Sequence, residues 1–264
     1  MEALDRALST ATLQIEEAQA TARIWQTYSD ILVSKSGFLY PVFTNEPEKT
    51  LYHNAMADKS TDASALYRGL LIQLNGIFEG YIRLLAGAVL DFKRTKVVSY
   101  ADLEDTLRIE HVVSSAKILS HLKSGSVNGI RHDFETTKTN LGKCLTDAKD
   151  FKLNKEAFTL LMGNCTPGRL ESLFESLGLP EPFQDKLAES KPLQRWADDK
   201  HKRRLASHVK EHLTFQIDTR NDIVHGNITK ALTHQDFQNA SSYFLALIQA
   251  LNELVKDGLA EVEA

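Results

Sequence analysis

Apolar residues recur at intervals of three and four along most of this chain, the spacing that one buried face of an α-helix requires. The first run extends from about Ala3 to Leu32 and carries Leu4, Leu8, Ala11, Ile15, Ala18, Ala22, Trp25, Tyr28 and Leu32. The clearest run carries Leu70, Leu71, Leu74, Ile77, Phe78, Tyr81, Leu84, Leu85 and Ala88. These runs predict a long amphipathic first helix and a central core helix.

Further helices are predicted by turn and capping signals. One helix is expected from Ala101 to Leu122 and a mixed helical region from there to about Gly163. Thr166 and Pro167 are typical of a helix start, and Gly178 is placed to end that short helix. A long helix is then expected from about Leu193 to Val224.

The last helix is predicted to begin after Thr233. Thr233 is a suitable N-cap, and Asp236 follows three residues later, as in a capping box. Its inward positions are Phe237, Ser241, Phe244, Leu245, Ile248, Leu251 and Val255. No apolar and polar residues alternate between hairpin turns anywhere in the chain, so the sequence predicts an all-α protein.

The stretch from Ser36 to Asp62 loses the helical period and contains Pro41, Asn45 and Pro47, so it is interpreted as a long connection. We therefore expect residues 1–62 to form an N-terminal helix and connection that pack on a helical domain at 63–264. The alternative is one domain across 1–264.

Composition narrows the classes of function. The 264 residues are 42% hydrophobic and 25% charged with a net charge of −4, so a nucleic-acid partner requires a local basic patch. No apolar stretch is long enough for a membrane span and no secretory leader is recognised, so a cytoplasmic protein with no membrane partner is expected. The two cysteines, Cys144 and Cys165, are expected to be buried thiols; a disulfide between them is the less favoured alternative.

Motifs for common cofactors are missing or weak. Gly142-Lys143 lacks the upstream glycine of a phosphate-binding loop and is followed by Cys144. His208-Val209-Lys210-Glu211-His212 matches the H-x-x-E-H zinc pattern, but a distal carboxylate ligand is offered only ambiguously by Glu253, Glu261 or Glu263. The preferred expectation is a site with no metal and no cofactor, with a zinc hydrolase as the third hypothesis.

The segment Arg220-Asn221-Asp222-Ile223-Val224-His225-Gly226 suits phosphodiester cleavage. Histidine moves a proton near neutral pH, arginine holds a phosphate through paired donors, and an amide orients either partner. On a helix, Asn221 and His225 share a face, whereas Arg220 and His225 diverge by about 140°. Either Arg220 reaches around the helix, or the helix ends at His225, and a homodimer would bring two copies together. The simpler interpretation is a helix cap beside a solvated arginine.

These residues resemble the Arg-Asn-x-x-x-His signature of HEPN-domain ribonucleases. The segment Phe78-Glu79-Gly80-Tyr81-Ile82-Arg83 is similar to an early helix of that family, which carries an acidic residue toward the active cleft. The stretch from Asn164 to Leu170, continuing through Leu177-Gly178-Leu179, resembles a region of the RiboL-PSP and MAE-type branches. The resemblance extends in outline from Ala63 to Leu259 and is specific only around Phe78–Arg83 and Arg220–Gly226.

The resemblance implies a HEPN-like bundle with an additional N-terminal helix and helical insertions, an obligate homodimer, and RNA cleavage without metal. It assigns Arg220 to the scissile phosphate, His225 to acid or base catalysis and Asn221 to positioning. It also assigns Glu79 to orienting His225 or Arg220; the competing interpretation is a plain ion pair with Arg83 one turn away. The family's nucleotidylated toxins carry a tyrosine two residues after the histidine, where this chain has Asn227, so that form of regulation is not expected.

A basic run, Lys200, Lys202, Arg203 and Arg204, precedes this segment and is a candidate RNA-binding track; a solvated charged face is the alternative. The favoured function is a toxin or phage-defence endoribonuclease, with transfer RNA as a plausible substrate and an antitoxin as a possible partner. The leading rival is a non-catalytic helical dimer that binds RNA, nucleotide or a partner protein.

Overall fold

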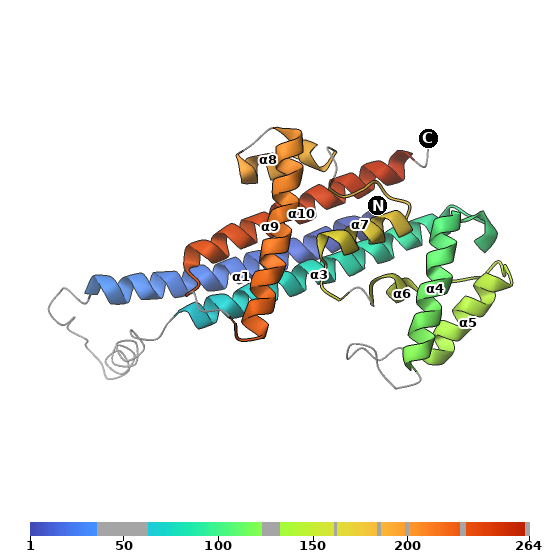
Figure 1. Ribbon diagram of the computed structural model, residues 1–264, viewed down its shortest axis with the longest axis horizontal. Coiled ribbons are helices and arrows are strands. Elements are labelled where there is room, and N and C mark those ends of the chain that lie inside the picture. Colours follow the sequence, from blue (N-terminus) through green and yellow to red (C-terminus); the bar gives the residue numbers. More distant parts are fainter. Residues whose placement is uncertain are drawn as a thin grey trace.

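The computed structural model describes residues 1–35, 63–122, 133–160, 163–183, 186–198, 201–227 and 231–261 (Figure 1). Every regular element in these ranges is a helix, which confirms the all-α prediction. The predicted connection from Ser36 to Asp62 lies outside the described residues.

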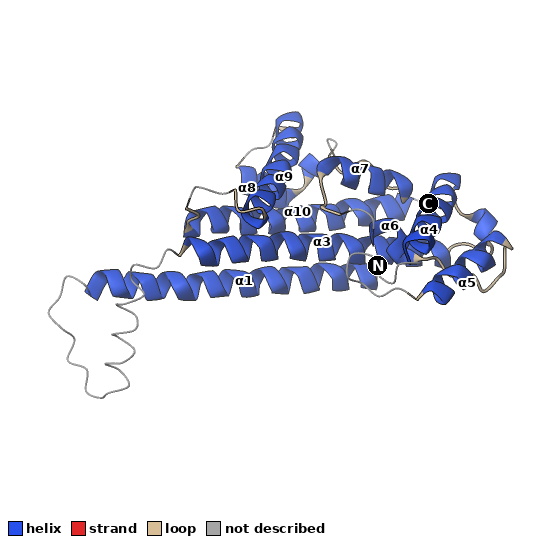
Figure 2. Ribbon diagram, turned by 60° about the horizontal axis from the view of Figure 1, so that its bottom comes forward, coloured by secondary structure: helices blue, strands red, loops and turns tan. Residues whose placement is uncertain are grey.

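Three long helices form the body of the molecule: α1 (Glu2–Lys35), α3 (Ser64–Thr95) and α10 (His234–Glu261). Each packs against the other two, and Figure 2 shows them lying side by side along the long axis. The predicted first, central and last helices are confirmed. The last begins as expected, because the Thr233 N–H donates to Asp236 Oδ2 at 2.9 Å and the Asp236 N–H donates to Thr233 Oγ1 at 3.2 Å.

Helices α3 and α10 run parallel with a nearly constant offset in the sequence. The Tyr67 hydroxyl lies 3.4 Å from His234 Nδ1, and the Tyr81 hydroxyl donates to the Ile248 carbonyl at 2.9 Å, so both pairs are 167 residues apart. Between them the Phe78 and Phe244 rings pack with centroids 5.3 Å apart. Tyr81 is almost fully buried, and its bond to a backbone carbonyl satisfies the hydroxyl within the core.

A second layer crosses this body and carries the candidate site. Helix α9 (Lys202–Val224) packs on α3 at a steep angle, flanked by α7 (Pro167–Ser176) and α8 (Lys191–Ala197), with a short 3₁₀ turn, η2 (Leu187–Glu189), before α8 (Figure 1). The prediction of one helix from Leu193 to Val224 is wrong. Helix α8 ends where Asp198 takes a left-handed conformation with φ 48°, which stops a helix and which aspartate tolerates better than most residues.

A smaller helical group packs at one end of the body. It contains η1 (Tyr100–Asp102), α4 (Asp105–Leu122), α5 (Phe134–Leu145) and α6 (Lys155–Leu160). The predicted helix from Ala101 to Leu122 begins too early. The Ser99 N–H donates to Asp102 Oδ2 at 2.8 Å, which caps a short 3₁₀ turn, and Leu103 is extended before α4 starts.

The buried side chain of His111 ties this group together. The backbone N–H of Asn154 donates to His111 Nε2 at 2.9 Å, so the proton of the neutral ring resides on Nδ1, 3.1 Å from the Tyr100 hydroxyl. The Asn154 amide in turn donates to Ser115 Oγ and to the Thr137 carbonyl. Burial lowers the pKa of His111 to about 4, and the fold depends on its neutral form.

Among the helices that the structure describes, none combines the length and the apolar character that a membrane crossing needs. The division into residues 1–62 and 63–264 stays a prediction, although α1 packs directly on α3 and α10.

We expect the stabilisation provided by His111 to disappear in acid. The unfolded histidine binds a proton below about pH 6.5, whereas the folded ring resists protonation until about pH 4, so stability falls across that window. His111→Ala should lower the free energy of unfolding by about 1–3 kcal/mol at pH 7.5, because the Asn154 N–H loses its acceptor. The difference in the free energy of unfolding between wild type and His111→Ala, measured by urea unfolding, should become smaller as the pH falls toward 4.

The exposed His121 on the same helix provides the control. His121→Ala should change stability little and should not alter its pH dependence. A His111→Ala difference that stays constant from pH 7.5 to pH 4 would contradict the neutral-ring assignment.

Candidate active site at the end of helix α9

The Arg220–Gly226 segment spans the C-terminus of α9. Gly226 has φ +70°, the Gly226 N–H donates to the Ile223 carbonyl at 3.2 Å and the Asn227 N–H donates to the Asp222 carbonyl at 2.8 Å. This pair of bonds is a Schellman motif, which requires the left-handed conformation that glycine adopts without strain. The helix therefore ends at Val224, and His225 is its exposed C-cap.

Arg220 and Asn221 are joined to a third residue from a distant loop. Arg220 Nη1 donates to Asn221 Oδ1 at 3.1 Å, and Asn164 Nδ2 donates to the same oxygen at 3.0 Å. Since this oxygen accepts two hydrogen bonds, the orientation of the Asn221 amide is fixed and its NH₂ group points away from both donors. The site residue Asn164 was missed by the sequence reasoning, which singled out the Asn164–Leu170 stretch only for its resemblance.

Glu79 projects from α3 toward the same group. Burial raises the pKa of Glu79, while the Arg220 and Arg83 guanidinium groups act in the opposite direction. Arg83 Nη2 lies 3.8 Å from Glu79 Oε2, so the ion pair proposed as the simple interpretation is present. The carboxylate is thus electrostatically coupled to Arg220 as well; none of the contacts among the described residues joins it to His225.

The loop before α7 completes the wall of the site. Arg169 Nη1 donates to the Asn164 carbonyl at 3.3 Å. Cys165 is buried, and burial together with the negative charge of Glu79 raises its pKa to about 12, against the opposing effect of Arg83 and Arg169. Arg83 and Arg220 thus act on the Glu79 carboxylate, and Arg83 and Arg169 act on the neighbouring Cys165, so three arginines lie around these two groups in an acidic protein.

The geometry of α9 does not place the basic run near Arg220. Arg204 is exposed, but it precedes Arg220 by sixteen positions, which on an α-helix is about 24 Å along the axis and about 160° around it. Lys200 lies outside the described residues, as do the side chains of Lys202 and Arg203. Their role in binding RNA stays a prediction.

The rival zinc motif is built into an aromatic cluster. The His212 ring packs against Trp196 and Tyr243, with centroids 5.0 and 4.5 Å away, and its Nε2 lies 3.0 Å from Gln216 Nε2. Burial and the neighbouring His208 lower the pKa of His212 to about 4. Within the described ranges no three His, Cys, Asp or Glu side chains are grouped to hold a metal ion, and Glu253 instead accepts a hydrogen bond from Ser190.

An all-α bundle with an Arg-Asn-x-x-x-His segment at a helix end defines a protein of the HEPN class. A family model described as RiboL-PSP-HEPN matches residues 46–257, and the chain belongs to this family. Membership indicates an RNA-related, nuclease-like role. Comparisons with curated proteins and with solved structures gave no match.

Both cysteines are free and buried, as expected, and burial raises the pKa of Cys144 to about 11. Neither thiol should react rapidly with 5,5′-dithiobis(2-nitrobenzoate) in the native protein at pH 8, because the thiolate is scarce and shielded. In denaturant both should react. Fast reaction of Cys165 in the native state would show that the wall around it opens.

Proposed function

We propose that this protein is a metal-independent endoribonuclease whose active site contains Arg220, Asn221, His225 and Glu79. The observation that carries this proposal is the hydrogen-bonded Arg220–Asn221 pair. This pair lies beside the Glu79 carboxylate, and Asn221 precedes His225 by one helical turn. An arginine, an oriented amide and a titratable imidazole are the groups that cleavage through an RNA 2′-hydroxyl requires.

Arg220 binds the scissile phosphate in this proposal. One of its five N–H donors is used on Asn221, and others remain for two phosphate oxygens. Glu79 holds the guanidinium in place from α3. Asn164 fixes the Asn221 amide, whose NH₂ group then donates to a phosphate oxygen.

His225 transfers the proton. The 2′-oxygen loses its proton to a base and attacks phosphorus, and the bond from phosphorus to the 5′-oxygen breaks as that oxygen receives a proton from an acid. The products are a 2′,3′-cyclic phosphate and a 5′-hydroxyl, with no net change in protons. A base and an acid are needed on opposite sides of the phosphorus; His225 fills one of these positions and water fills the other.

A symmetric dimer would bring Arg220 and His225 of different protomers to one site. Val224 and His225 are exposed at the end of α9, and no described residue hydrogen-bonds the His225 ring. A two-fold axis beside this helix end would place two such segments face to face and let the arginine of one protomer act with the histidine of the other.

Within a cell, the proposed activity suits a cytoplasmic toxin or phage-defence effector, with transfer RNA as a candidate substrate and an antitoxin or other regulator as a candidate partner. The competing proposal is a non-catalytic dimer that binds RNA, nucleotide or protein through the same residues. The unconstrained ring of His225 favours it, since a catalytic imidazole is usually oriented by a neighbour.

We expect purified wild-type protein to cut total bacterial RNA into discrete fragments in excess EDTA, as resolved on a denaturing gel. His225→Ala should reduce the rate by about 10²–10⁴-fold, since it removes proton transfer, and Arg220→Ala by about 10²–10³-fold. Both variants should retain the helical circular-dichroism spectrum. Intact RNA with wild type and both variants would favour the binding module.

Mixing two inactive variants tests the composite dimer. If each site takes Arg220 from one protomer and His225 from the other, a mixed dimer of Arg220→Ala and His225→Ala contains one intact site. Random exchange of subunits should then restore about a quarter of wild-type activity. No recovery in a mixture that mass measurement shows to contain mixed dimers would place both residues of a site on one protomer.

A further inference from the structure

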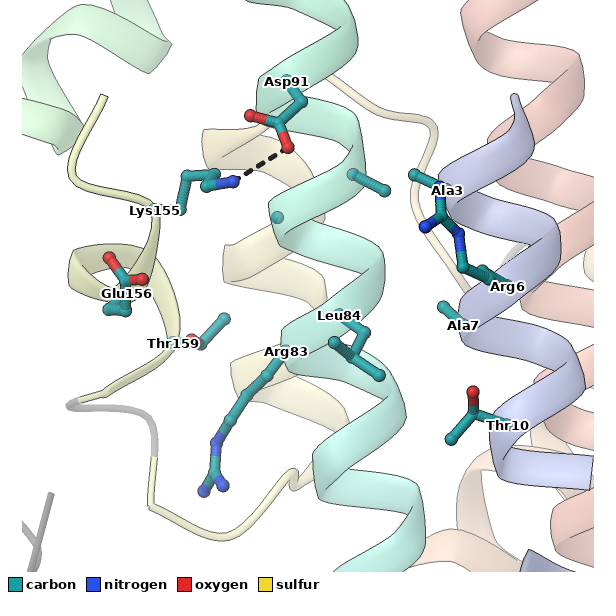
Figure 3. A pocket seen from close by; sticks show the side chains of 12 residues that line it. Ala3, Arg6, Ala7, Thr10, Arg83, Leu84, Asp91, Lys155, Glu156 and Thr159 are labelled. Atoms are coloured by element: carbon teal, nitrogen blue, oxygen red, sulfur yellow. Dashed lines mark hydrogen bonds and ion pairs between the residues drawn. The ribbon is translucent and has the colours of Figure 1, made fainter. Parts of the chain in front are cut away.

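A groove of about 460 Å³ runs over the outward face of α3, next to the proposed active site. Helix α1 forms one wall and α6 forms the other, with α3 between them (Figure 3). This volume lies within the range of about 300–1,000 Å³ for small-ligand sites.

The floor of the groove is apolar and is made largely of small side chains. Leu84, with 51% of its surface exposed, lies beside Gly87 and Ala88 of α3, and Ala3 and Ala7 of α1 continue the same surface. Small residues leave room for a flat ring to lie directly against α3. An unpaired nucleobase has two flat faces that can cover such an apolar surface, and it also stacks on guanidinium planes.

Charged groups lie at the two ends of this floor, and Glu156 and Arg6 line its two walls. Arg83 is at one end (Figure 3), and at the other end Lys155 Nζ is 2.8 Å from Asp91 Oδ2. Eight positions separate Arg83 from Asp91 on α3, which is about 12 Å. A nucleotide has the matching polarity, with an anionic phosphate at one end and hydrogen-bonding base edges at the other.

Arg83 also connects the groove to the active site. Its guanidinium lies 3.8 Å from the carboxylate of Glu79, and that same carboxylate is acted on by Arg220. An RNA chain with its scissile phosphate on Arg220 therefore has a neighbouring phosphate within reach of Arg83. One wall, α1, lies outside the region 46–257 that the family model matches.

We propose that this groove binds the nucleoside next to the cleaved bond of a single-stranded RNA. Its phosphate contacts Arg83, its base lies over Leu84 and Gly87, and the base edge meets the Asp91–Lys155 pair. This inference rests on the proposed ribonuclease function and adds a subsite to it. Substrate selection then depends on the base that fits between α1 and α6.

Gly87→Trp fills the groove without displacing the backbone. A Cβ atom at Gly87 would meet only Lys155 Cδ, at 4.0 Å, and Gly69 offers open space for the same change. Gly69 is eighteen residues earlier on α3, which places it on the same helical face about 27 Å away. Gly69→Trp is therefore the matched control, and Arg83→Ala removes the proposed phosphate contact.

The probe is a fluorescein-labelled hexaribonucleotide of mixed sequence with 2′-fluoro sugars, which lack the attacking hydroxyl and stay intact. In fluorescence anisotropy, Gly87→Trp and Arg83→Ala should each raise the Kd by about tenfold, the loss of one stacked base or one phosphate contact, and Gly69→Trp should leave it unchanged. Equal Kd values for wild type and Gly87→Trp, or no binding by wild type, would overturn the subsite.

Two further outcomes separate the subsite from other interpretations. Binding that depends on Gly87 in a protein that cuts no RNA would support RNA binding by the groove and refute the nuclease. A change in oligomeric mass in Gly87→Trp, with an unchanged Kd for the probe, would show that the groove contacts protein and would refute the subsite.

Discussion

The burial of α3 is the constraint on which the rest of this structure depends. Its apolar side chains meet α1 and α10, and the parallel offset with α10 is held by Tyr67 and Tyr81 at two points three turns or more apart. Because one side of the helix is fully committed to the core, Glu79 and Arg83 are confined to the remaining strip. The core packing thereby determines where the Glu79 carboxylate lies relative to α9 and to the loop at Asn164.

Much of the fold could be predicted because the buried face of a long helix is visible in the sequence as apolar residues at intervals of three and four. The first, central and last helices were found in this way, and the Thr233 cap was located to the residue. The break between α8 and α9 was not, because no proline or glycine marks it and the helix ends at Asp198, which takes a left-handed conformation. A single residue in a left-handed conformation cannot be predicted from the spacing of apolar residues.

The residues of the candidate site likewise fall into two groups, those that could be predicted from the sequence and those that could not. Arg220, Asn221 and His225 are neighbours in sequence, and Gly226 signals the helix end, so one short segment contains them. Asn164 reaches Asn221 across 57 residues, and Arg169 joins the group through that loop. Contacts between such distant segments depend on how α7 and α9 pack, which no spacing rule for a single helix can supply. The role assigned to Glu79 came from the family resemblance.

Helix α1 precedes the region that the family model matches, and it packs on α3 and α10 without supplying any of the four proposed catalytic side chains. If the proposed groove binds substrate, one of its walls is encoded apart from all four proposed catalytic side chains. Substitutions in the first turns of α1 would then change the shape of that wall and leave those four side chains as they are.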